Sequence, residues 1–544
     1  MTSRDAFHVY DTTLRDGAQQ EGLNLSVADK LNIARQIDGL GVGYIEGGWP
    51  GSNPKDTEFF RRAREELVLK NATLAAFGAT RRAGVAAADD PLVAALRDSG
   101  AAVVTLVAKS HDRHVELALR TTLDENLAMV RDTVTHLTRE GQRVFLDAEH
   151  FFDGYRANRD YALRVLHTAF EAGAEVVALC DTNGGMLPNW VADVVGDVVG
   201  RTGADPGSGH RVGIHCHNDT GCAVANTLSA VGAGATHVQG TLNGYGERTG
   251  NADLVSVVAN LELKLNRQVL PEGLLSEATR IAHAVAEVTN FPPASRQPYV
   301  GVSAFAHKAG LHASAIKVDP DLYQHMRPEG VGNNMRLLIS DMAGRASIEL
   351  KGRELGFDLS GDSAEARAVV DRVTTRVKQM ESRGYTFEAA DASFELLLVE
   401  EVEGARPSYF DVESWRVITE TLSHARPGEE AVSEATVKLR AGGARIVSTG
   451  EGNGPVNALD HALRSAIGQA YPEVAKFELI DYKVRILDQG HGTDAITRVL
   501  IETSDGASSW VTVGVGANVI EASWGALVDG LTFGLRRAQG RNGA

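Results

Sequence analysis

Cysteine is scarce in this sequence, which has three in 544 residues: Cys180, Cys216 and Cys222. A small, odd count in a long chain argues against a disulfide framework and is typical of a reducing compartment. The chain has no CxxC pair, so it does not predict a structural zinc site of that type. We therefore expect a cytoplasmic protein.

Long apolar runs and an excess of basic residues are also missing. No uninterrupted apolar stretch approaches the roughly 18 residues that a membrane-spanning helix needs. The first residues, MTSRDAFHVYDTTLRDG, lack the basic region and apolar run of a signal peptide. The formal net charge is -17, whereas phosphate binding requires concentrated Lys and Arg. Neither a membrane nor a nucleic acid is expected as a partner.

The first 265 residues alternate between short apolar runs and amphipathic helical stretches. The runs predict eight strands, at 7–13, 44–49, 73–79, 102–108, 143–149, 175–181, 211–217 and 236–242. Helical patterns follow them near 26–40, 54–66, 89–99, 124–140, 158–172, 188–200, 220–232 and 252–265. Such alternation implies a parallel sheet, and eight units of this total size predict a (β/α)₈ TIM barrel. A doubly wound sheet is the alternative.

Two further parts are predicted after a catalytic barrel domain at 1–275. Residues 276–390 form a small, mostly helical connecting region, with a Pro-rich linker at 291–301. Residues 391–544 are predicted as an α+β domain of regulatory or dimerisation type. Its strand-like segments include SFELLLVEEV, WRVITETL and ATVKLRA.

An approximate internal repeat supports this last assignment. GNGPVNALDHAL at 452–463 resembles GVGANVIEASWGAL at 514–527, and in each a strand runs through Gly-x-Gly into a helix. We expect two pseudo-symmetric units; chance similarity of two glycine-rich helix starts is the alternative.

The strongest chemical signal is RVGIHCHND, at the end of the seventh predicted strand. His215 and His217 are two residues apart, so their side chains share one face of the strand. Two imidazoles at a barrel strand end make a good metal site; a structural histidine pair is the alternative. Asp16 follows the first strand in YDTTLRDG and completes a two-histidine, one-carboxylate set for a divalent ion. Arg15, beside it, is suited to stabilise a developing negative oxygen.

Other strand ends carry further candidates. Asp147 and Glu149 share a face of the fifth strand, where a carboxylate suits acid–base work. Thr182 follows the sixth strand and is placed to donate to a substrate carboxylate. Asn251 lies in the glycine-rich NGYGERTGNADL, either as a ligand or as a helix N-cap.

Three of these segments, DTTLRDG (11–17), HCHND (215–219) and GERTGNADL (246–254), resemble the metal-dependent acyl-CoA condensing enzymes. This is the 2-isopropylmalate, homocitrate and citramalate synthase family of the DRE-TIM metallolyase superfamily. The resemblance covers nearly the whole chain and implies a metal-assisted Claisen condensation of acetyl-CoA with a 2-oxo acid, with Mg²⁺, Mn²⁺ or Zn²⁺ as the ion.

The resemblance also implies residue roles. Asp16, His215 and His217 match metal ligands, with Asn251 as a weaker one. Catalytic roles fall to Arg15, Glu149, His312 and Tyr323, and Arg15, Gln19 and Thr182 match the substrate-binding positions. In the family's homodimers, His312, a proposed base, and its partner Tyr323 are supplied across the dimer. No residue is assigned to coenzyme A.

Substrate choice depends on YIEGGWPGSNPKD (44–56), which looks like the pyruvate-using branch, the (R)-citramalate synthases of isoleucine biosynthesis. Trp49 would shrink the pocket, although size alone discriminates one methylene by only about 1–3 kcal/mol. The alternative is that Trp49 packs beneath a loop. The C-terminal part resembles the family's allosteric domain, which implies isoleucine, or leucine, as feedback inhibitor, bound near the Gly-x-Gly turns.

Several alternatives remain at this point. A 2-isopropylmalate or homocitrate synthase shares every catalytic residue named. A 3-hydroxy-3-methylglutaryl-CoA lyase uses a cysteine in the loop that is NGYGERTGNADL here, where there is none. A non-catalytic amino-acid sensor would not need the intact set of polar residues, and a biotin-dependent carboxyltransferase would need a biotin-acceptor segment, which the sequence lacks.

Overall fold

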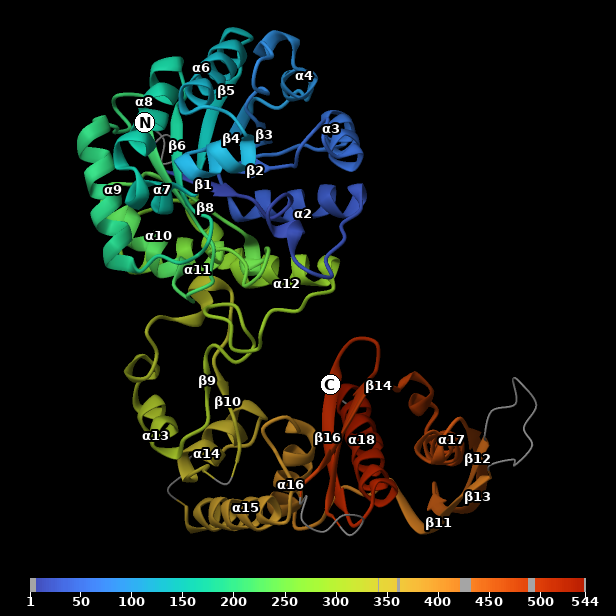
Figure 1. Cartoon of the computed structure of the whole chain (residues 1–544). Coiled ribbons are helices and arrows are strands. Elements are labelled where there is room, and N and C mark those ends of the chain that lie inside the picture. The colour runs from blue at the N-terminus through green and yellow to red at the C-terminus, as the bar shows by residue number, and fades with distance from the viewer. Residues whose placement is uncertain (1–5, 341, 360–362, 421–431, 488–494, 543–544) are drawn as a thin grey trace. The chain divides into compact units, whose positions relative to one another are not determined.

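The computed structural model describes residues 6–340, 342–359, 363–420, 432–487 and 495–542 (Figure 1). The chain divides into two compact units. One comprises Met1–Phe305 with Met326–Asn334, and the other Ala306–His325 with Met335–Ala544. In the described part of the chain, no helix is long and apolar enough to cross a membrane.

The first unit contains a closed barrel of eight parallel strands (Figure 1). The strands are β1 (His8–Asp11), β2 (Tyr44–Glu46), β3 (Thr73–Ala79), β4 (Val103–Lys109), β5 (Arg143–Glu149), β6 (Val176–Asp181), β7 (Arg211–Cys216) and β8 (His237–Gly240). Each pairs with its neighbour in sequence, and β8 pairs with both β7 and β1, which closes the ring. The predicted TIM barrel is confirmed, and the doubly wound alternative is wrong.

Helices surround the strands. The predicted ones are α2 (Val27–Leu40), α3 (Pro54–Glu66), α4 (Pro91–Asp98), α6 (Leu123–Arg139), α8 (Arg159–Ala172), α9 (Pro188–Thr202), α10 (Ala223–Gly232) and α11 (Leu254–Leu263). Short helices α5 (Asp112–His114) and α7 (Phe151–Ala157) precede α6 and α8, and α12 (Ala278–Thr289) packs against α2. Local signals explain the helix ends: Ser26 and Asp29 form a capping box on α2, and Gly41 ends that helix in the left-handed conformation.

Apolar side chains fill the inside of the barrel below its carboxyl end. Tyr10, Tyr44, Phe145 and Val176 form a buried cluster with Ala75 and Val103. A larger buried cluster lies between the strands and the helices. The strands therefore enclose a packed core rather than a channel, and the space for a ligand lies at their carboxyl ends.

The second unit begins with small elements. They are β9 (Ala306–His307), which pairs with β10 (Arg336–Leu337), and helices α13 (Gly310–Val318), α14 (Arg345–Glu354), α15 (Ala364–Ser382) and α16 (Asp391–Glu403). The segment SFELLLVEEV, predicted as a strand, lies in helix α16, so that prediction is wrong. Ala392 and Leu396 join one buried cluster while Phe394, Leu397 and Leu398 join another. Because the helix is buried on two sides, its sequence lacks the polar stripe that marks an amphipathic helix.

Two similar α+β units complete the chain. The first has an antiparallel sheet of β11 (Phe410–Glu420), β12 (Val432–Ala441) and β13 (Ala444–Gly452), followed by α17 (Pro455–Gly468). The second has β14 (Glu478–Ile486), β15 (Thr497–Ser504) and β16 (Ser509–Gly516), followed by α18 (Val519–Asn542). The predicted repeat is confirmed. The end of the predicted strand WRVITETL, residues 421 and 422, lies outside the described residues.

Two glycines show how the repeats correspond. A Cβ on Gly450 would meet the backbone N of Ala462 at 2.4 Å, and one on Gly514 would meet the backbone O of Ala522 at 1.9 Å. In each unit the helix thus packs directly on the backbone of the last strand. Gly450 and Gly452 therefore correspond to Gly514 and Gly516, two residues earlier than the sequence alignment had placed the match.

Candidate functional site

A cavity of about 620 Å³ opens at the carboxyl ends of the barrel strands. Its walls include all the predicted barrel residues except Asn251, together with Phe77, Lys109, Cys180 and Arg248. The polar residues listed from the sequence come from strands far apart in the chain, and the closed barrel brings them to one mouth. Those present in the wall are Arg15, Asp16, Gln19, Trp49, Asp147, Glu149, Thr182, His215 and His217.

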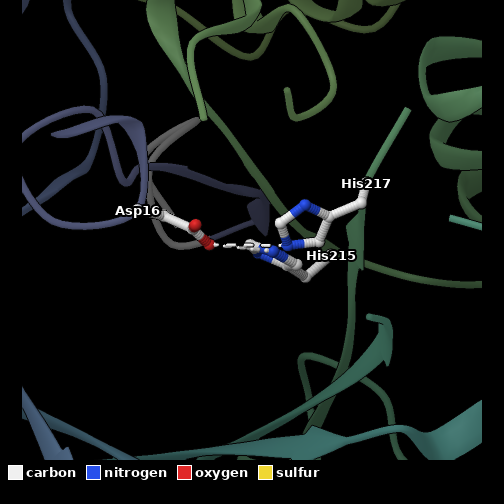
Figure 2. Close-up of side chains that lie close together, drawn as sticks. All are labelled: Asp16, His215 and His217. Carbon is white, nitrogen blue, oxygen red and sulfur yellow. Dashed lines mark ion pairs between the residues drawn. The ribbon is translucent and has the colours of Figure 1, made fainter. Parts of the chain in front are cut away.

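Asp16, His215 and His217 lie together at one side of this cavity, and all three are buried (Figure 2). The Nε2 atoms of His215 and His217 are 3.2 and 3.9 Å from Oδ2 of Asp16. One ligand atom from each residue lies within 4.8 Å of the others. Two imidazoles and a carboxylate so close together fit a divalent ion that keeps further coordination positions open.

The protonation of Asp16 and His217 also fits an ion; burial acts to lower the pKa of His215, but the hydrogen bond and charge of Asp16 raise it above its usual value. Burial alone would raise the pKa of Asp16, but Arg15, His215 and His217 hold it well below its usual range. Burial, and then the charge of His215, lower the pKa of His217 to about 4. At neutral pH Asp16 is therefore an anion and His217 a neutral imidazole, which are the forms that bind metals.

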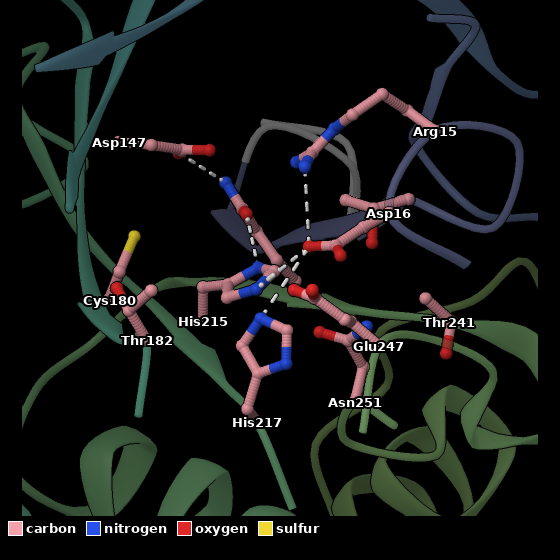
Figure 3. A network of polar contacts seen from close by, with 12 residues as sticks. Arg15, Asp16, Asp147, Cys180, Thr182, His215, His217, Thr241, Glu247 and Asn251 are labelled. Carbon is pink, nitrogen blue, oxygen red and sulfur yellow. Dashed lines mark hydrogen bonds and ion pairs between the residues drawn. The ribbon is translucent and has the colours of Figure 1, made fainter. Parts of the chain in front are cut away.

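A chain of hydrogen bonds runs from His215 through Gln239 to Asp147, and Figure 3 labels its two ends. The Gln239 amide nitrogen donates to Oδ1 of Asp147 at 2.8 Å, so its Oε1 is the atom that faces Nδ1 of His215, at 2.9 Å. That oxygen can only accept, so Nδ1 of His215 carries a proton and Nε2 is the ring nitrogen that faces Asp16. Sequence reasoning missed Gln239, because a single polar residue inside the short strand HVQG carries no local signal.

Asn251 lies beside His217, with which it forms an isolated β-bridge. Its amide nitrogen donates to the backbone O of Tyr245 at 3.0 Å, and its Oδ1 is buried without a hydrogen-bond partner in the described part of the chain. The N-cap alternative is wrong, because Asp253 caps helix α11. A buried acceptor without a partner next to His217 is what a weaker fourth ligand would require.

Arg15 is fixed by two neighbours. Its Nε donates to Glu46 Oε2 at 2.6 Å, and its guanidinium carbon lies 3.9 Å from the centre of the Phe77 ring. Its Nη1 lies 3.3 Å from Asp16. Glu46, at the end of β2, is fully buried and also accepts a hydrogen bond from Tyr10. Sequence reasoning quoted Glu46 within YIEGG but gave it no role; a carboxylate inside an apolar strand was the available signal.

Glu149 and Thr182 lie across the cavity on the ends of β5 and β6. Glu149 pairs with Lys109 of β4. The Thr182 hydroxyl accepts a hydrogen bond from the backbone N–H of His150 at 2.8 Å. Since its oxygen is already occupied as an acceptor, the hydroxyl proton is free to be donated to a ligand.

Gln19 and Trp49 lie at the other side of the cavity. Gln19 is exposed, in the 3₁₀ turn Gly17–Gln19 directly after Asp16. The Trp49 ring packs edge-on against Phe77, with ring centres 5.5 Å apart. It lines the cavity, so it does not merely pack beneath a loop.

His312 and Tyr323 belong to the second unit. His312 lies in α13, Tyr323 follows a short 3₁₀ turn, and their ring centres are 4.2 Å apart. The two rings are therefore in contact. His307, which has no assigned role, lies in β9 with its ring centre 6.4 Å from that of His312.

Comparison with known protein families covers most of the chain. The HMGL-like family matches residues 6–285, the homocitrate synthase post-HMGL domain-like family residues 299–384, and the LeuA allosteric (dimerisation) domain residues 388–535. The (R)-citramalate synthase of Streptomyces coelicolor is 68% identical over 98% of this chain and 97% of its own. The chain belongs to the family of the (R)-citramalate synthases.

Two further relatives show how sequence identity to this chain varies within and beyond the citramalate synthases. The (R)-citramalate synthase of Synechocystis sp. is 47% identical over 98% of this chain and 97% of its own. A 2-isopropylmalate synthase from Pseudoalteromonas atlantica is 30% identical, over 96% of this chain and 94% of its own. Of these three relatives, the two citramalate synthases are more similar in sequence to the chain than the isopropylmalate synthase is, over nearly equal lengths.

Proposed function

We propose that this chain is an (R)-citramalate synthase, which condenses acetyl-CoA with pyruvate and water to give (R)-citramalate and CoA. One observation carries the proposal: a buried two-histidine, one-carboxylate set and a fixed arginine share one barrel cavity, in a chain whose nearly full-length relatives bear this name. The reaction is an acyl transfer in which the acetyl group becomes an alkyl group.

Asp16, His215 and His217 would hold the divalent ion, with Asn251 as a weaker ligand. Carboxylate and imidazole ligands suit Mg²⁺, Mn²⁺ or Zn²⁺. Such an ion supplies a Lewis acid for the ketone oxygen of pyruvate.

The side chains around the cavity supply positioning and charge. Thr182 has a hydroxyl proton free to hold the pyruvate carboxylate, and Gln19 borders the same space. Arg15 stabilises the negative oxygen that develops as the carbon–carbon bond forms, and because Glu46 holds its guanidinium in place this stabilisation costs little reorganisation. Glu149 assists removal of a proton from the acetyl methyl group.

His312, with Tyr323, is proposed as the base that takes this proton. The support is their place in AHKAGLHASA and DPDLYQHMRPEGVG and the contact between their rings. Replacing His312 by Gln should lower kcat by about 10²–10⁴-fold, as expected for loss of a general base, and leave metal binding unchanged. Equal losses in kcat and in metal affinity would contradict the assignment.

The C-terminal domain is proposed to bind a branched-chain amino acid, isoleucine or leucine, as feedback inhibitor, and to contribute to a homodimer. A cavity of about 690 Å³ beside the start of α17 supports the first part, since Gly454 and Asn457 line it along with apolar side chains; Arg464 also lines it but is already paired with Asp460. Backbone amides at a helix start can hold a carboxylate. A cytoplasmic location remains a prediction from the low cysteine content, and the three-part division at residues 275 and 390 also remains a proposal.

The deciding experiment is release of free CoA thiol from acetyl-CoA with pyruvate, 2-oxoisovalerate or 2-oxoglutarate, with and without Mg²⁺ or Mn²⁺. Metal-dependent turnover that prefers pyruvate is expected. Preference for 2-oxoisovalerate would move the chain to the isopropylmalate synthases. No release with any of the three would exclude a condensing enzyme and favour the acyl-CoA lyase or sensor alternatives.

A further inference from the structure

A buried ion pair lies outside the reacting centre, between the first two barrel helices. Lys30 of α2 and Asp56 of α3 are 3% and 6% exposed, and their side chains pair directly. Buried charges of this kind are weak evidence for stability, because desolvation offsets most of their attraction. What they contact is therefore more informative than the pair itself.

Both partners hold the same short loop, Gly47–Gly48–Trp49, between β2 and α3. The Lys30 ammonium donates to the backbone O of Gly47 at 3.0 Å, and Asp56 Oδ2 accepts from the backbone N–H of Trp49 at 2.9 Å. Gly48 has φ +136°, and a Cβ there would lie 2.4 Å from the Asp56 carboxyl carbon. The loop is thus pressed onto the ion pair, which adds two contacts to the backbone hydrogen bonds that the loop makes with Ala75, Phe77 and Asn53.

Trp49, which ends this loop, stands between two cavities. It lines the cavity of about 620 Å³ described above and a second one of about 270 Å³, whose walls also include Lys30 and Asp56. The two cavities share only Arg15, Gln19 and Trp49 among their described lining residues. Of these, Trp49 is the large apolar side chain, so its ring is the main partition.

No hydrogen bond fixes the ring of Trp49. Its Nε1 is buried and has no partner among the residues described, and the ring contacts Phe77 edge-on. The position of the partition therefore depends on the backbone of Trp49, whose N–H is held by Asp56 and whose carbonyl accepts from the N–H of Asn53.

We propose that Lys30 and Asp56 are positioning residues that set the size of the accepted 2-oxo acid, by holding Trp49 as a closed partition between the two cavities. The inference rests on the proposed function. With the partition in place, the pocket ends near the methyl group of pyruvate. With the partition displaced, the second cavity receives the longer side chain of 2-oxobutanoate or 2-oxoisovalerate.

The test compares the ratio of kcat/KM for pyruvate to kcat/KM for 2-oxobutanoate in four proteins: wild type, Lys30→Met with Asp56→Asn, Trp49→Ala, and the triple variant. The double variant leaves no unpaired buried charge and keeps an acceptor for the Trp49 N–H. We expect the ratio to fall about tenfold in the double variant and in Trp49→Ala, within the range that one methylene allows. The triple variant should equal Trp49→Ala, because the pair acts only through Trp49.

A matched control comes from the same helix. Asp38 of α2 is also 6% exposed, and it accepts hydrogen bonds from the backbone N–H groups of residues 70–72, before β3. Asp38→Asn should destabilise the barrel without changing the ratio. An unchanged ratio in the double variant, or a fall in Asp38→Asn of the same size, overturns the inference.

A second readout needs no turnover. Acrylamide quenching of Trp49 fluorescence, obtained by subtracting a Trp49→Phe protein, should at least double in the double variant. Unchanged quenching overturns the inference even in an active enzyme. A wild type that releases no CoA overturns the proposed function instead, while the quenching still reports whether the pair holds the partition.

Discussion

Glu46 holds Arg15 in place, with its Oε2 2.6 Å from the arginine Nε, and it does so from a fully buried position at the end of a neighbouring strand. The guanidinium is thereby held between this carboxylate, the Phe77 ring and Asp16 before any substrate is present. Such preorganisation is the main way in which a protein stabilises charge that appears only during a reaction.

Replacing Glu46 by Gln should therefore lower kcat for CoA release by on the order of 10²-fold, because a misplaced catalytic group costs about this much. The KM for acetyl-CoA should change little. Tyr10→Phe is the control, since it removes the other hydrogen bond to Glu46 and keeps the ion pair with Arg15. A loss as large in Tyr10→Phe would show that packing around Glu46, not the pair, matters.

Replacing His217 by Ala should abolish tight metal binding. It removes one of three ligand atoms that lie within 4.8 Å of each other, so we expect Mn²⁺ affinity to fall by more than the roughly 10–100-fold typical of residues that only orient a ligand. Isothermal titration calorimetry and the metal-dependent rise in Tm both measure this. His210, which stacks on Phe170 and does not line the cavity, is the control. Unchanged Mn²⁺ affinity in His217→Ala would remove His217 from the site.

Gln239 should affect the Mn²⁺ affinity of the site although it is not one of the proposed ligands. Gln239→Leu frees the ring of His215 to change tautomer, so Mn²⁺ affinity should drop about 10–100-fold. Gln142, whose amide nitrogen bonds the carbonyls of Leu96 and Arg97, gives a matched control as Gln142→Leu. Equal affinity in both variants and wild type would mean that Asp16 alone orients His215.

Asp11 gives a pH-dependent contribution to stability that is independent of the metal. Burial raises its pKa from 3.8 to about 7. The unfolded chain therefore releases this proton first, and the contribution of Asp11 to stability falls as pH rises from about 4 to 7, by up to roughly 4 kcal/mol. In urea unfolding, the stability difference between wild type and Asp11→Asn should shift in favour of the variant between pH 4.5 and pH 8. A difference that does not vary with pH contradicts this prediction.

The features that the sequence predicted correctly rest on a repeated pattern or on the end of a strand. The β/α alternation predicted the barrel, and the barrel placed Asp16 near His215 and His217 although about 200 residues separate them. Glu46 and Gln239 were not predicted because their roles depend on which strand lies next to which, and a strand interior shows this only after the ring is closed.

Two predictions from local sequence patterns were inaccurate. One assigned a helix as a strand, and the other placed the internal repeat out of register. Helix α16 looked like a strand because it is buried between two clusters, which removes the usual polar face. The internal repeat was found, but two residues out of register. The glycines that correspond are those on which a helix packs, and Gly454, which the sequence had matched, has open space at its Cβ position.

The position of β8 determines when Asp16, His215 and His217 come together during folding. Asp16 follows β1, while His215 and His217 come from the end of β7, and β8 is the strand that pairs with both. Until residues 237–240 have been synthesised, β1 and β7 are the two open edges of the sheet. No strand then holds Asp16 beside His215 and His217. An ion held by Asp16, His215 and His217 would therefore depend on β8, and it would link the two strands that β8 joins.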